Sequence, residues 1–349
     1  MKIYLAGRQD NLRSITLFHA LARLGYEGLV ITSPAETYVS VGYFDKTEEI
    51  LDLQKCKEEG IPVIRREVGG GAVLLDENQV FYQLILRRNT GKLPFKIEEA
   101  YRKFSVPVIE TYRRLGVETE YRPINDIVVK ESKRKISGQG AADIGDSFVF
   151  VGGLLIRFNT KLMSEIFRVP EEKFRDKIYK SLEENLSWVE RETGRMPSYE
   201  EVANILAEEF SKVAEFDGFG EIPPEAVSLA DELKEEFTSE EFLLEDTGRK
   251  HRAIKIREGV FVRTAVHKAR GGLLRAEVHI GEGKIEEVRI YGDFTLYPRS
   301  ALRDLEESLK GVVFEEKPIR TRLEEFFKRE DVEFPGVGVE DLIQVIYGE

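Results

Sequence analysis

The chain is poor in the residues that build disulfides and thiolate metal sites. Its 349 residues include one cysteine, Cys56. A single cysteine excludes an internal disulfide and a thiolate-rich metal site. Its position in the polar stretch 51–59 favours a structural role over a nucleophilic one. The histidines show no spacing typical of metal ligands: His19, His251, His267 and His279.

Long apolar runs are also missing, since none approaches the ~20 residues that a membrane span requires. The first residues do not resemble a secretory signal. The net charge of −12 argues against broad binding to nucleic acids or anionic membranes, because neutralising phosphates needs clustered Lys and Arg. We therefore expect a soluble cytoplasmic protein whose partners include neither nucleic acid nor membrane.

Charged residues make up 33% of the chain, with both signs interspersed, whereas methionine occurs only 3 times. This pattern suits ion-pair networks on the surface of a thermophile protein, and an ordinary soluble surface is the alternative. Within the acidic background the basic group Lys133-Arg134-Lys135 stands out.

The hydrophobic pattern predicts interspersed helices and strands. Expected helices lie at 12–24, 47–59, 97–115, 171–191, 199–213, 224–237 and 300–309. Expected strands lie at 2–6, 28–32, 38–42, 61–65, 71–75, 80–87, 121–129, 147–158, 251–266, 272–280 and 284–291. The runs 71–75 and 80–87 flank a polar turn and are interpreted as a β-hairpin.

The stretch Phe216–Pro224 is rich in glycine and proline and is interpreted as a linker. It divides the chain into domains 1–221 and 222–349, and we expect the second to be a smaller α+β domain.

Three consecutive glycines, Gly69, Gly70 and Gly71, follow a predicted strand and the pair Arg65-Arg66. Such a run is costly, because each glycine loses much backbone freedom on folding. It is kept where the backbone must approach something closely or adopt positive φ. Arginine guanidinium groups suit phosphate or carboxylate. The alternative is a tight turn with solvated arginines.

A second polar group follows at Asn125, Asp126 and Lys135. Asn125 and Asp126 precede an apolar run, which places them at the entry to a strand. A carboxylate there can hold Mg²⁺ together with substrate phosphates, or it can simply cap a strand-end turn. Lys135 precedes apolar Ile136 and could point inward, although a lone lysine is more often solvated.

The common nucleotide-binding motifs are absent. No Gly-x-x-x-x-Gly-Lys-Ser/Thr sequence occurs, and the triple glycine opens a strand instead of a helix. Nucleotide binding, if present, therefore uses another geometry.

Taken together, these segments resemble lipoate–protein ligases. The resemblance rests on the order Arg65-Arg66-x-x-Gly69-Gly70-Gly71-Ala72-Val73, then Asn125-Asp126, then Lys135-Ile136-Ser137-Gly138. It continues through Leu162–Lys180, which resembles an adenylate-side loop, and through Lys284–Phe294, which resembles the C-terminal accessory domain. It implies the biotin/lipoate ligase fold, an α+β architecture with a mixed-sheet catalytic domain followed by an α+β accessory domain.

The resemblance implies a two-step reaction in which lipoate or octanoate reacts with ATP to give an acyl-adenylate, and the acyl group then passes to a lysine of a carrier. The implied partner is a lipoyl-domain protein, such as the glycine cleavage H protein or a 2-oxoacid dehydrogenase E2 subunit. The implied loop closure over the adenylate falls on Leu162–Lys180.

The resemblance also assigns roles to residues. Lys135 is the implied catalytic residue, and Asp126 the implied Mg²⁺ ligand. The implied ATP and adenylate contacts are Arg66, Gly71, Ala72, Val73, Leu74, Asn125, Asp126 and Lys135. The implied lipoate contacts are Arg65, Gly70, Gly71, Lys135 and Gly138.

The chain departs from the family pattern at three places. Leu75-Asp76 stands where many relatives have His-Asp, and Ser137-Gly138-Gln139-Gly140-Ala141 stands where they have Ser-Gly-Ser-Ala. Val151-Gly152-Gly153-Leu154-Leu155 replaces a His-Gly-Thr pattern. Because the charged groups remain, these changes bear on acyl selection or on the acyl donor.

Three alternatives stay open. An octanoyl or lipoyl transferase is similar in the same segments. Such enzymes commonly use a cysteine late in the catalytic domain, or a lysine paired with one, and no cysteine follows Cys56. A biotin ligase shares the fold but has a different motif. A non-catalytic acyl-binding or carrier-docking protein would not need Arg66, Asp126 and Lys135.

Overall fold

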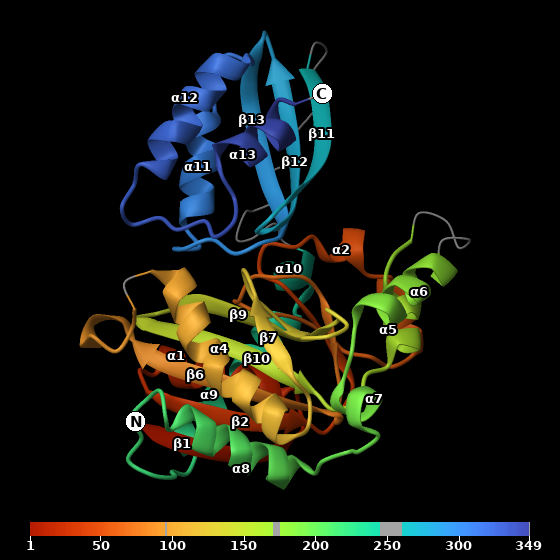
Figure 1. Cartoon of the computed structure of the whole chain (residues 1–349). Coiled ribbons are helices and arrows are strands. Elements are labelled where there is room, and N and C mark those ends of the chain that lie inside the picture. Colours follow the sequence, from red (N-terminus) through yellow and green to blue (C-terminus); the bar gives the residue numbers. More distant parts are fainter. Residues whose placement is uncertain (95, 170–174, 245–259, 349) are drawn as a thin grey trace. The chain divides into compact units, whose positions relative to one another are not determined.

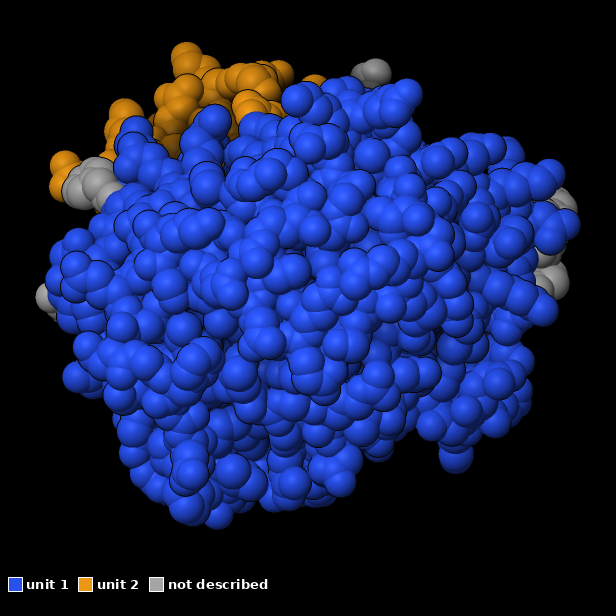
Figure 2. All heavy atoms as spheres, turned by 60° about the horizontal axis from the view of Figure 1, so that its bottom comes forward, with its two compact units in different colours: residues 1–41, 47–67, 72–243 blue, residues 42–46, 68–71, 244–349 orange. Residues whose placement is uncertain are grey.

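The computed structural model describes residues 1–94, 96–169, 175–244 and 260–348. These residues fall into two compact units, coloured separately in Figure 2. Unit 1 holds residues 1–41, 47–67 and 72–243, and unit 2 holds residues 42–46, 68–71 and 244–349. No helix among the described residues is long and apolar enough to cross a membrane.

Unit 1 is built on a mixed sheet with the strand order β1-β2-β6-β10-β9-β8-β7. Strands β1 and β2 are parallel, and each later pair is antiparallel. The strands are β1 (Lys2–Gln9), β2 (Gly28–Pro34), β6 (Gln79–Arg87), β7 (Thr119–Arg122), β8 (Asp126–Val129), β9 (Lys135–Ile144) and β10 (Ser147–Leu155). The expected strand 121–129 is thus a hairpin of two strands, turning at residues 123–125.

Helices cover both faces of this sheet (Figure 1). On one face, Tyr82 of β6 packs against Phe210, and Phe150 of β10 packs against Tyr101 and Phe104. These partners come from α8 (Tyr199–Phe210) and α4 (Ile97–Arg114). The other face is covered by α1 (Arg13–Arg23), which in turn packs against α9 (Pro224–Thr238). The apolar periodicity therefore correctly predicts these four helices, with small shifts at their ends.

The remaining helices of unit 1 are short or peripheral. They are α2 (Thr47–Ile50), α3 (Leu53–Glu58), the 3₁₀ turn η1 (Arg88–Thr90), α5 (Thr160–Ile166), α6 (Arg175–Asn185), α7 (Val189–Thr193) and α10 (Glu240–Leu244). The single helix expected at 47–59 is interrupted because Asp52 accepts a hydrogen bond from the Lys55 amide and so begins α3 anew. Residues 170–174 of the implied loop Leu162–Lys180 lie outside the described residues.

A second, small sheet in unit 1 has the order β4-β3-β5. Its strands are β3 (Tyr38–Val41), β4 (Val63–Arg65) and β5 (Val73–Leu75). The predicted hairpin of 71–75 with 80–87 is wrong, because β5 pairs with β3, whereas β6 pairs with β2 and β10 in the main sheet. Asp76 instead closes a turn between the sheets by accepting the Asn78 amide at 2.8 Å.

The predicted linker at 216–224 is not a free connection. The Ile3 amide donates to the Gly218 carbonyl at 3.1 Å, and the Gly220 amide donates to the Ile3 carbonyl at 3.0 Å. The segment therefore runs beside β1. Since α9 also packs on α1, the division between the units falls at Leu243/Leu244 and not near residue 221.

Unit 2 has a sheet of order β11-β12-β13 packed against helices. Its elements are β11 (Val260–Ala269), β12 (Gly272–Gly281), β13 (Lys284–Asp293), α11 (Ala301–Leu309), α12 (Glu316–Phe327) and α13 (Val339–Ile346). Residues 251–259 of the strand expected at 251–266 lie outside the described residues. The pattern otherwise correctly predicts these strands and α11.

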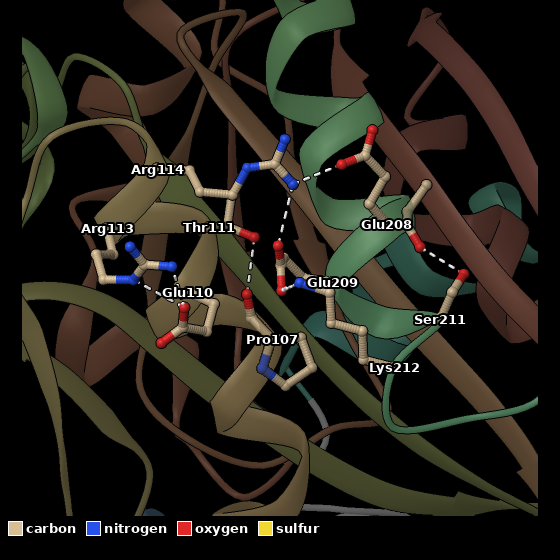
Figure 3. Close-up of polar contacts among 10 residues, drawn as sticks. Pro107, Glu110, Thr111, Arg113, Arg114, Glu208, Glu209, Ser211 and Lys212 are labelled. Carbon is tan, nitrogen blue, oxygen red and sulfur yellow. Dashed lines mark hydrogen bonds and ion pairs between the residues drawn. The ribbon is translucent and has the colours of Figure 1, made fainter.

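An ion-pair cluster joins the ends of α4 and α8 in unit 1 (Figure 3). Glu209 is only 2% exposed and lies 3.0 Å from Arg114 and 2.6 Å from Lys212. Burial on its own raises the pKa of the Glu209 carboxyl, but hydrogen bonds from Lys212 and Arg114 hold it below its ordinary value. The charged form of Glu209 is therefore the one that stabilises the fold.

We expect Glu209→Gln to lower the free energy of unfolding by about 1–3 kcal/mol at neutral pH, the scale of a charge-assisted hydrogen bond. Because the folded pKa is depressed, this contribution is present above the unfolded pKa of about 4.3 and is lost as pH falls through the folded value. Urea unfolding between pH 7 and 3 measures it. If acidification lowered the free energy of unfolding by the same amount in wild type and variant, this assignment would be contradicted.

Candidate active site

The charged residues predicted from the sequence meet at the β8–β9 hairpin of unit 1. Asp126 begins β8, as expected from the apolar run that follows it, whereas Lys135 begins β9, a strand that was not predicted from the sequence. The Lys135 Nζ lies 2.8 Å from Asp126 Oδ1, and Arg122 Nη2 lies 2.7 Å from Asp126 Oδ2. One carboxylate thus holds two cations, one on each oxygen.

The environment keeps Asp126 ionised. Burial alone raises the pKa of its carboxyl, but the charges and hydrogen bonds of Lys135 and then Arg122 hold the pKa below its ordinary value. Lys135 remains 38% exposed and Asp126 21% exposed. An anionic substrate therefore has access to the Lys135 ammonium.

The position of the Lys135 side chain depends on Gly138. Asp126 pairs with Gly138 across the strands, and the register shifts so that Val128 pairs with Lys135. A Cβ atom on Gly138 would lie 3.1 Å from both Cε and Nζ of Lys135. The missing side chain at Gly138 therefore provides the space through which the lysine reaches Asp126.

We expect Gly138→Ala to displace the Lys135 ammonium without unfolding the chain, because the colliding atoms are at the end of a flexible side chain. Misplacing a reacting group by about 1 Å can cost up to about 10²-fold in rate. The kinetics of the adenylate-forming step that the resemblance implies would measure the loss, with thermal unfolding as the check on the fold. An unchanged rate would show that Lys135 does not need this position.

Buried hydrogen bonds fix the strand beneath these groups. Asn125 Nδ2 donates to the Gln139 carbonyl at 2.9 Å, and the Gln139 amide donates to the Asn125 carbonyl at 2.9 Å. The buried Gln139 side chain accepts from Ser105 at 2.7 Å and donates to Tyr82 at 3.1 Å. Gln139, which departs from the family pattern, thus ties Asn125 to the core.

The two arginines before the triple glycine lie in different environments. Arg66 Nη1 donates to the carbonyl and hydroxyl of Ser40 at 3.0 and 3.2 Å, and its side chain is partly exposed. Arg65 is 2% exposed, and its Nη2 donates to Thr47 Oγ1 at 3.0 Å and to the Leu243 carbonyl at 2.7 Å. These contacts favour a structural role for Arg65, and its lipoate contact stays a prediction.

The triple glycine has contacts within unit 2. The Gly70 amide donates to the Phe294 carbonyl at 3.1 Å, and a Cβ atom on Gly69 would lie 2.5 Å from the same oxygen. A Cβ atom on Gly71 would lie 3.3 Å from the Asp293 carboxyl carbon. Close approach to the 293–294 turn therefore accounts for Gly69, so phosphate binding need not explain all three glycines.

The following residues, Ala72, Val73 and Leu74, belong to unit 1. Leu74 is buried in the core of the small sheet, Ala72 packs against that core, and Val73 is 38% exposed. The main chain of this segment and the exposed Val73 side chain are therefore accessible to a ligand. The ATP and lipoate contacts assigned to Gly70, Gly71 and these residues stay predictions.

The described residues contain no group of three or more His, Cys, Asp or Glu side chains that could hold a metal ion. A single carboxylate, Asp126, nevertheless fits Mg²⁺ that arrives with a nucleotide, because Mg²⁺ needs only one or two carboxylates beside phosphates. Each carboxylate oxygen accepts more than one partner, so Lys135 and Arg122 leave capacity on Asp126.

Arg122 is absent from the residues predicted from the sequence. It stands four positions before Asp126 in a segment expected to be one continuous strand, where such residues would not meet. Recognising Pro123 as a turn residue between two strands would have indicated the contact, because Arg122 and Asp126 then face each other across a hairpin.

Sequence profiles of known families match both units. The profile of the lipoyl protein ligase A/B catalytic domain matches residues 14–211. The profile of the bacterial lipoate protein ligase C-terminus matches residues 261–346. Between them they cover most of the chain.

Two relatives represent the two activities of this family. Lipoate-protein ligase A subunit 1 of Thermoplasma acidophilum is 31% identical over 58% of this chain and 79% of its own length. Octanoyltransferase LipM of Oceanobacillus iheyensis is 25% identical over 50% of this chain and 69% of its own length. Both matches involve a similar share of this chain.

Solved structures agree with the fold. A bipartite lipoate protein ligase of Thermoplasma acidophilum, studied with its E2 lipoyl domain, superposes with a TM-score of 0.62 at 27% identity, over 72% of this chain and 98% of its own. LipL1 of P. falciparum in complex with lipoate gives 0.68 at 15% identity, over 95% of each chain, and so supports the fold alone. The chain belongs to the lipoate–protein ligase family, with the biotin/lipoate ligase fold and a C-terminal domain.

Proposed function

We propose that this chain is an ATP-dependent lipoate–protein ligase. The observation that carries the proposal is the cluster of Lys135, Asp126 and Arg122 beside Gly138, where an accessible ammonium is fixed by an ionised carboxylate. Such a preorganised charge suits a reaction in which negative charge builds on phosphate oxygens.

The reaction has two steps. A carboxylate oxygen of lipoate or octanoate attacks the α-phosphorus of ATP, and the bond to the leaving pyrophosphate breaks. The amine of a carrier lysine then attacks the acyl carbon, loses a proton and releases AMP. No covalent enzyme intermediate is needed, because the adenylate is itself a good leaving group.

The residues of this chain bind and orient the reactants. Lys135 would contact the acid's carboxylate and the α-phosphate, and Asp126 holds its ammonium in place. Arg66, anchored on Ser40, would bind the nucleotide phosphates. Asn125, anchored on Gln139, would face the nucleotide. The main chain of 72–74 would line the acyl-adenylate.

Asp126 would hold Mg²⁺ together with the nucleotide phosphates. When bound, the ion neutralises phosphate charge and stabilises the leaving pyrophosphate.

The second candidate is an octanoyltransferase, favoured by the similarity to LipM. A thioester route through cysteine meets an obstacle in this chain. Its only cysteine, Cys56, is 1% exposed within the core of the small sheet, and burial raises the pKa of its thiol to about 11. A protonated, inaccessible thiol is a poor nucleophile, which supports the ligase over this transferase mechanism.

The acyl acceptor we propose is a small acidic lipoyl domain, of a 2-oxoacid dehydrogenase E2 subunit or the glycine cleavage H protein. The turn between β8 and β9 is basic and exposed, with Lys130 and Lys133 next to the Lys135 site. Lys133 is partly neutralised by Glu120 at 2.6 Å. This turn gives an otherwise acidic chain a local surface that attracts an acidic carrier.

Mass spectrometry of a purified lipoyl domain tests the proposal. Incubation with this protein, ATP, Mg²⁺ and lipoate should add one lipoyl group to the carrier lysine, and omitting ATP should abolish the addition. Acylation from octanoyl acyl carrier protein without ATP would instead establish the transferase.

A further inference from the structure

Arg122 shares Asp126 with Lys135, and it is the more loosely held of the two cations. Arg122 stands directly opposite Asp126 across the β7–β8 hairpin, and its Nη2 lies 2.7 Å from Asp126 Oδ2. A second hydrogen bond, to the Lys133 carbonyl, is long at 3.4 Å. The Arg122 side chain is 48% exposed, compared with 38% for Lys135. The guanidinium therefore loses few contacts when it moves away from Asp126.

The charges around Asp126 oppose the binding of a free divalent cation. Two cations on one carboxylate leave a local charge of one positive unit. Although the Asp126 oxygens keep lone pairs for a further partner, a divalent cation there would meet both the Lys135 ammonium and the Arg122 guanidinium. Like charges at such distances repel, and the partial burial of Asp126 reduces screening by water. In this arrangement Asp126 is therefore a poor site for free Mg²⁺.

A nucleoside triphosphate changes this balance of charge. Its phosphates are strongly negative, and they supply oxygen ligands that Mg²⁺ needs in addition to one or two carboxylates. They also match the forked donors of a guanidinium. The other acid of β7, Glu120, points to the same face as Arg122 but is already paired with Lys133 at 2.6 Å. A phosphate is therefore the partner best suited to receive Arg122 when it leaves Asp126.

We propose that Arg122 closes the Asp126 site to free divalent cations, and that ATP opens the site by drawing the guanidinium onto its phosphates. Arg122 is thereby a further nucleotide-binding residue that couples metal binding to nucleotide binding. The inference rests on the proposed function for the identity of the nucleotide. It adds a residue outside Asn125-Asp126 and Lys135, the motif on which the family resemblance rests.

This role predicts opposite effects on two binding equilibria when the charge of Arg122 is removed. The affinity for a divalent cation alone should rise, because a competing positive charge is gone. The affinity for the nucleotide with its cation should fall, because a phosphate contact is gone. The coupling free energy between cation and nucleotide, which each ligand reports equally, should therefore decrease. A residue with a merely structural role would weaken both equilibria or neither.

Two binding measurements on the full chain, made without any acid substrate, test the inference. Mn²⁺ is the probe, because it takes the same oxygen ligands as Mg²⁺ and its free concentration is measured by electron paramagnetic resonance. Arg122→Gln should bind Mn²⁺ alone about five- to tenfold more tightly than wild type. In calorimetry it should bind Mn²⁺-saturated ATP about five- to tenfold more weakly, the scale of one partly exposed charge-assisted contact. Adding Asp126→Asn should abolish the gain for Mn²⁺ alone, which locates the cation.

Arg134→Gln is the matched control. It removes the same charge from the β8–β9 turn beside Lys135, where Arg134 Nε donates to the Glu184 carbonyl at 3.3 Å. It should leave both affinities within about twofold of wild type. Arg122→Lys keeps the charge and should bind Mn²⁺ alone as weakly as wild type does. Affinities of Arg122→Gln that change in the same direction or not at all, or a gain for Mn²⁺ shared by Arg134→Gln, would overturn the inference.

The outcomes separate this inference from the proposed function. Acid-dependent pyrophosphate exchange together with unchanged affinities in Arg122→Gln would leave the ligase intact and remove the role of Arg122. Opposite shifts of the two affinities without any exchange would keep the role of Arg122 and overturn the ligase. Absence of ATP binding to wild type would overturn the ligase and, with it, the opening of the site by ATP.

Discussion

Lys135→Met should reduce the rate of acyl-adenylate formation by about 10²–10³-fold, the effect of removing one charge-stabilising donor from a transition state. The loss should appear mainly in kcat, because the ammonium stabilises charge that develops during the attack on phosphorus. Pyrophosphate release with lipoate, ATP and Mg²⁺ measures it.

The fold should survive this change. Lys135 is 38% exposed, and methionine keeps most of its length. Lys96→Met, at an exposed lysine before α4, is the matched control and should keep the wild-type rate. A Lys135→Met rate within threefold of wild type would remove the lysine from the chemistry.

Asp126→Asn should lower kcat/KM for adenylation by about 10–100-fold, the range seen when a partner that orients a metal-binding or catalytic group is lost. The amide keeps the shape but removes the charge that holds Lys135 at 2.8 Å and Arg122 at 2.7 Å. It also weakens the proposed Mg²⁺ site. The apparent affinity for Mg²⁺-ATP should therefore fall more than that for lipoate.

Asp143→Asn provides a matched control on the same strand. Asp143 lies near the other end of β9, is 25% exposed and accepts from Arg88 at 2.7 Å. Its loss should affect stability and leave the affinity for Mg²⁺-ATP unchanged. Equal kinetic effects of the two substitutions would show that Asp126 acts through stability alone.

The charged centre could be predicted from the sequence because its signals are local. Asn125 and Asp126 lie at the entry to β8, as their position before an apolar run predicted, and Lys135 begins β9, a strand that was not predicted. The hairpin that joins these strands brings the residues together without help from distant parts of the chain. The order of these residues along the chain resembles that of lipoate–protein ligases, and this resemblance predicted their chemical roles.

Features that depend on distant pairing could not be predicted in this way. β5 and β6 resemble a hairpin because a polar turn separates two apolar runs, yet β5 pairs with β3 and β6 with β2. Gly69 is explained by the carbonyl of Phe294, more than two hundred residues later. Nothing in a linear pattern reveals such a neighbour.

The same limit applies to the apparent linker. A Gly- and Pro-rich stretch is typical of connections, but the backbone of 218–220 hydrogen-bonds to Ile3 at the start of the chain.

ATP–pyrophosphate exchange is the measurement that tests the ligase most directly. In the presence of Mg²⁺ and lipoate or octanoate, radiolabel from pyrophosphate should enter ATP without any carrier protein present. Omitting the acid should abolish the exchange, as should Lys135→Met. Absence of exchange with either acid, together with octanoyl transfer from acyl carrier protein to a lipoyl domain, would contradict the ligase and identify a transferase.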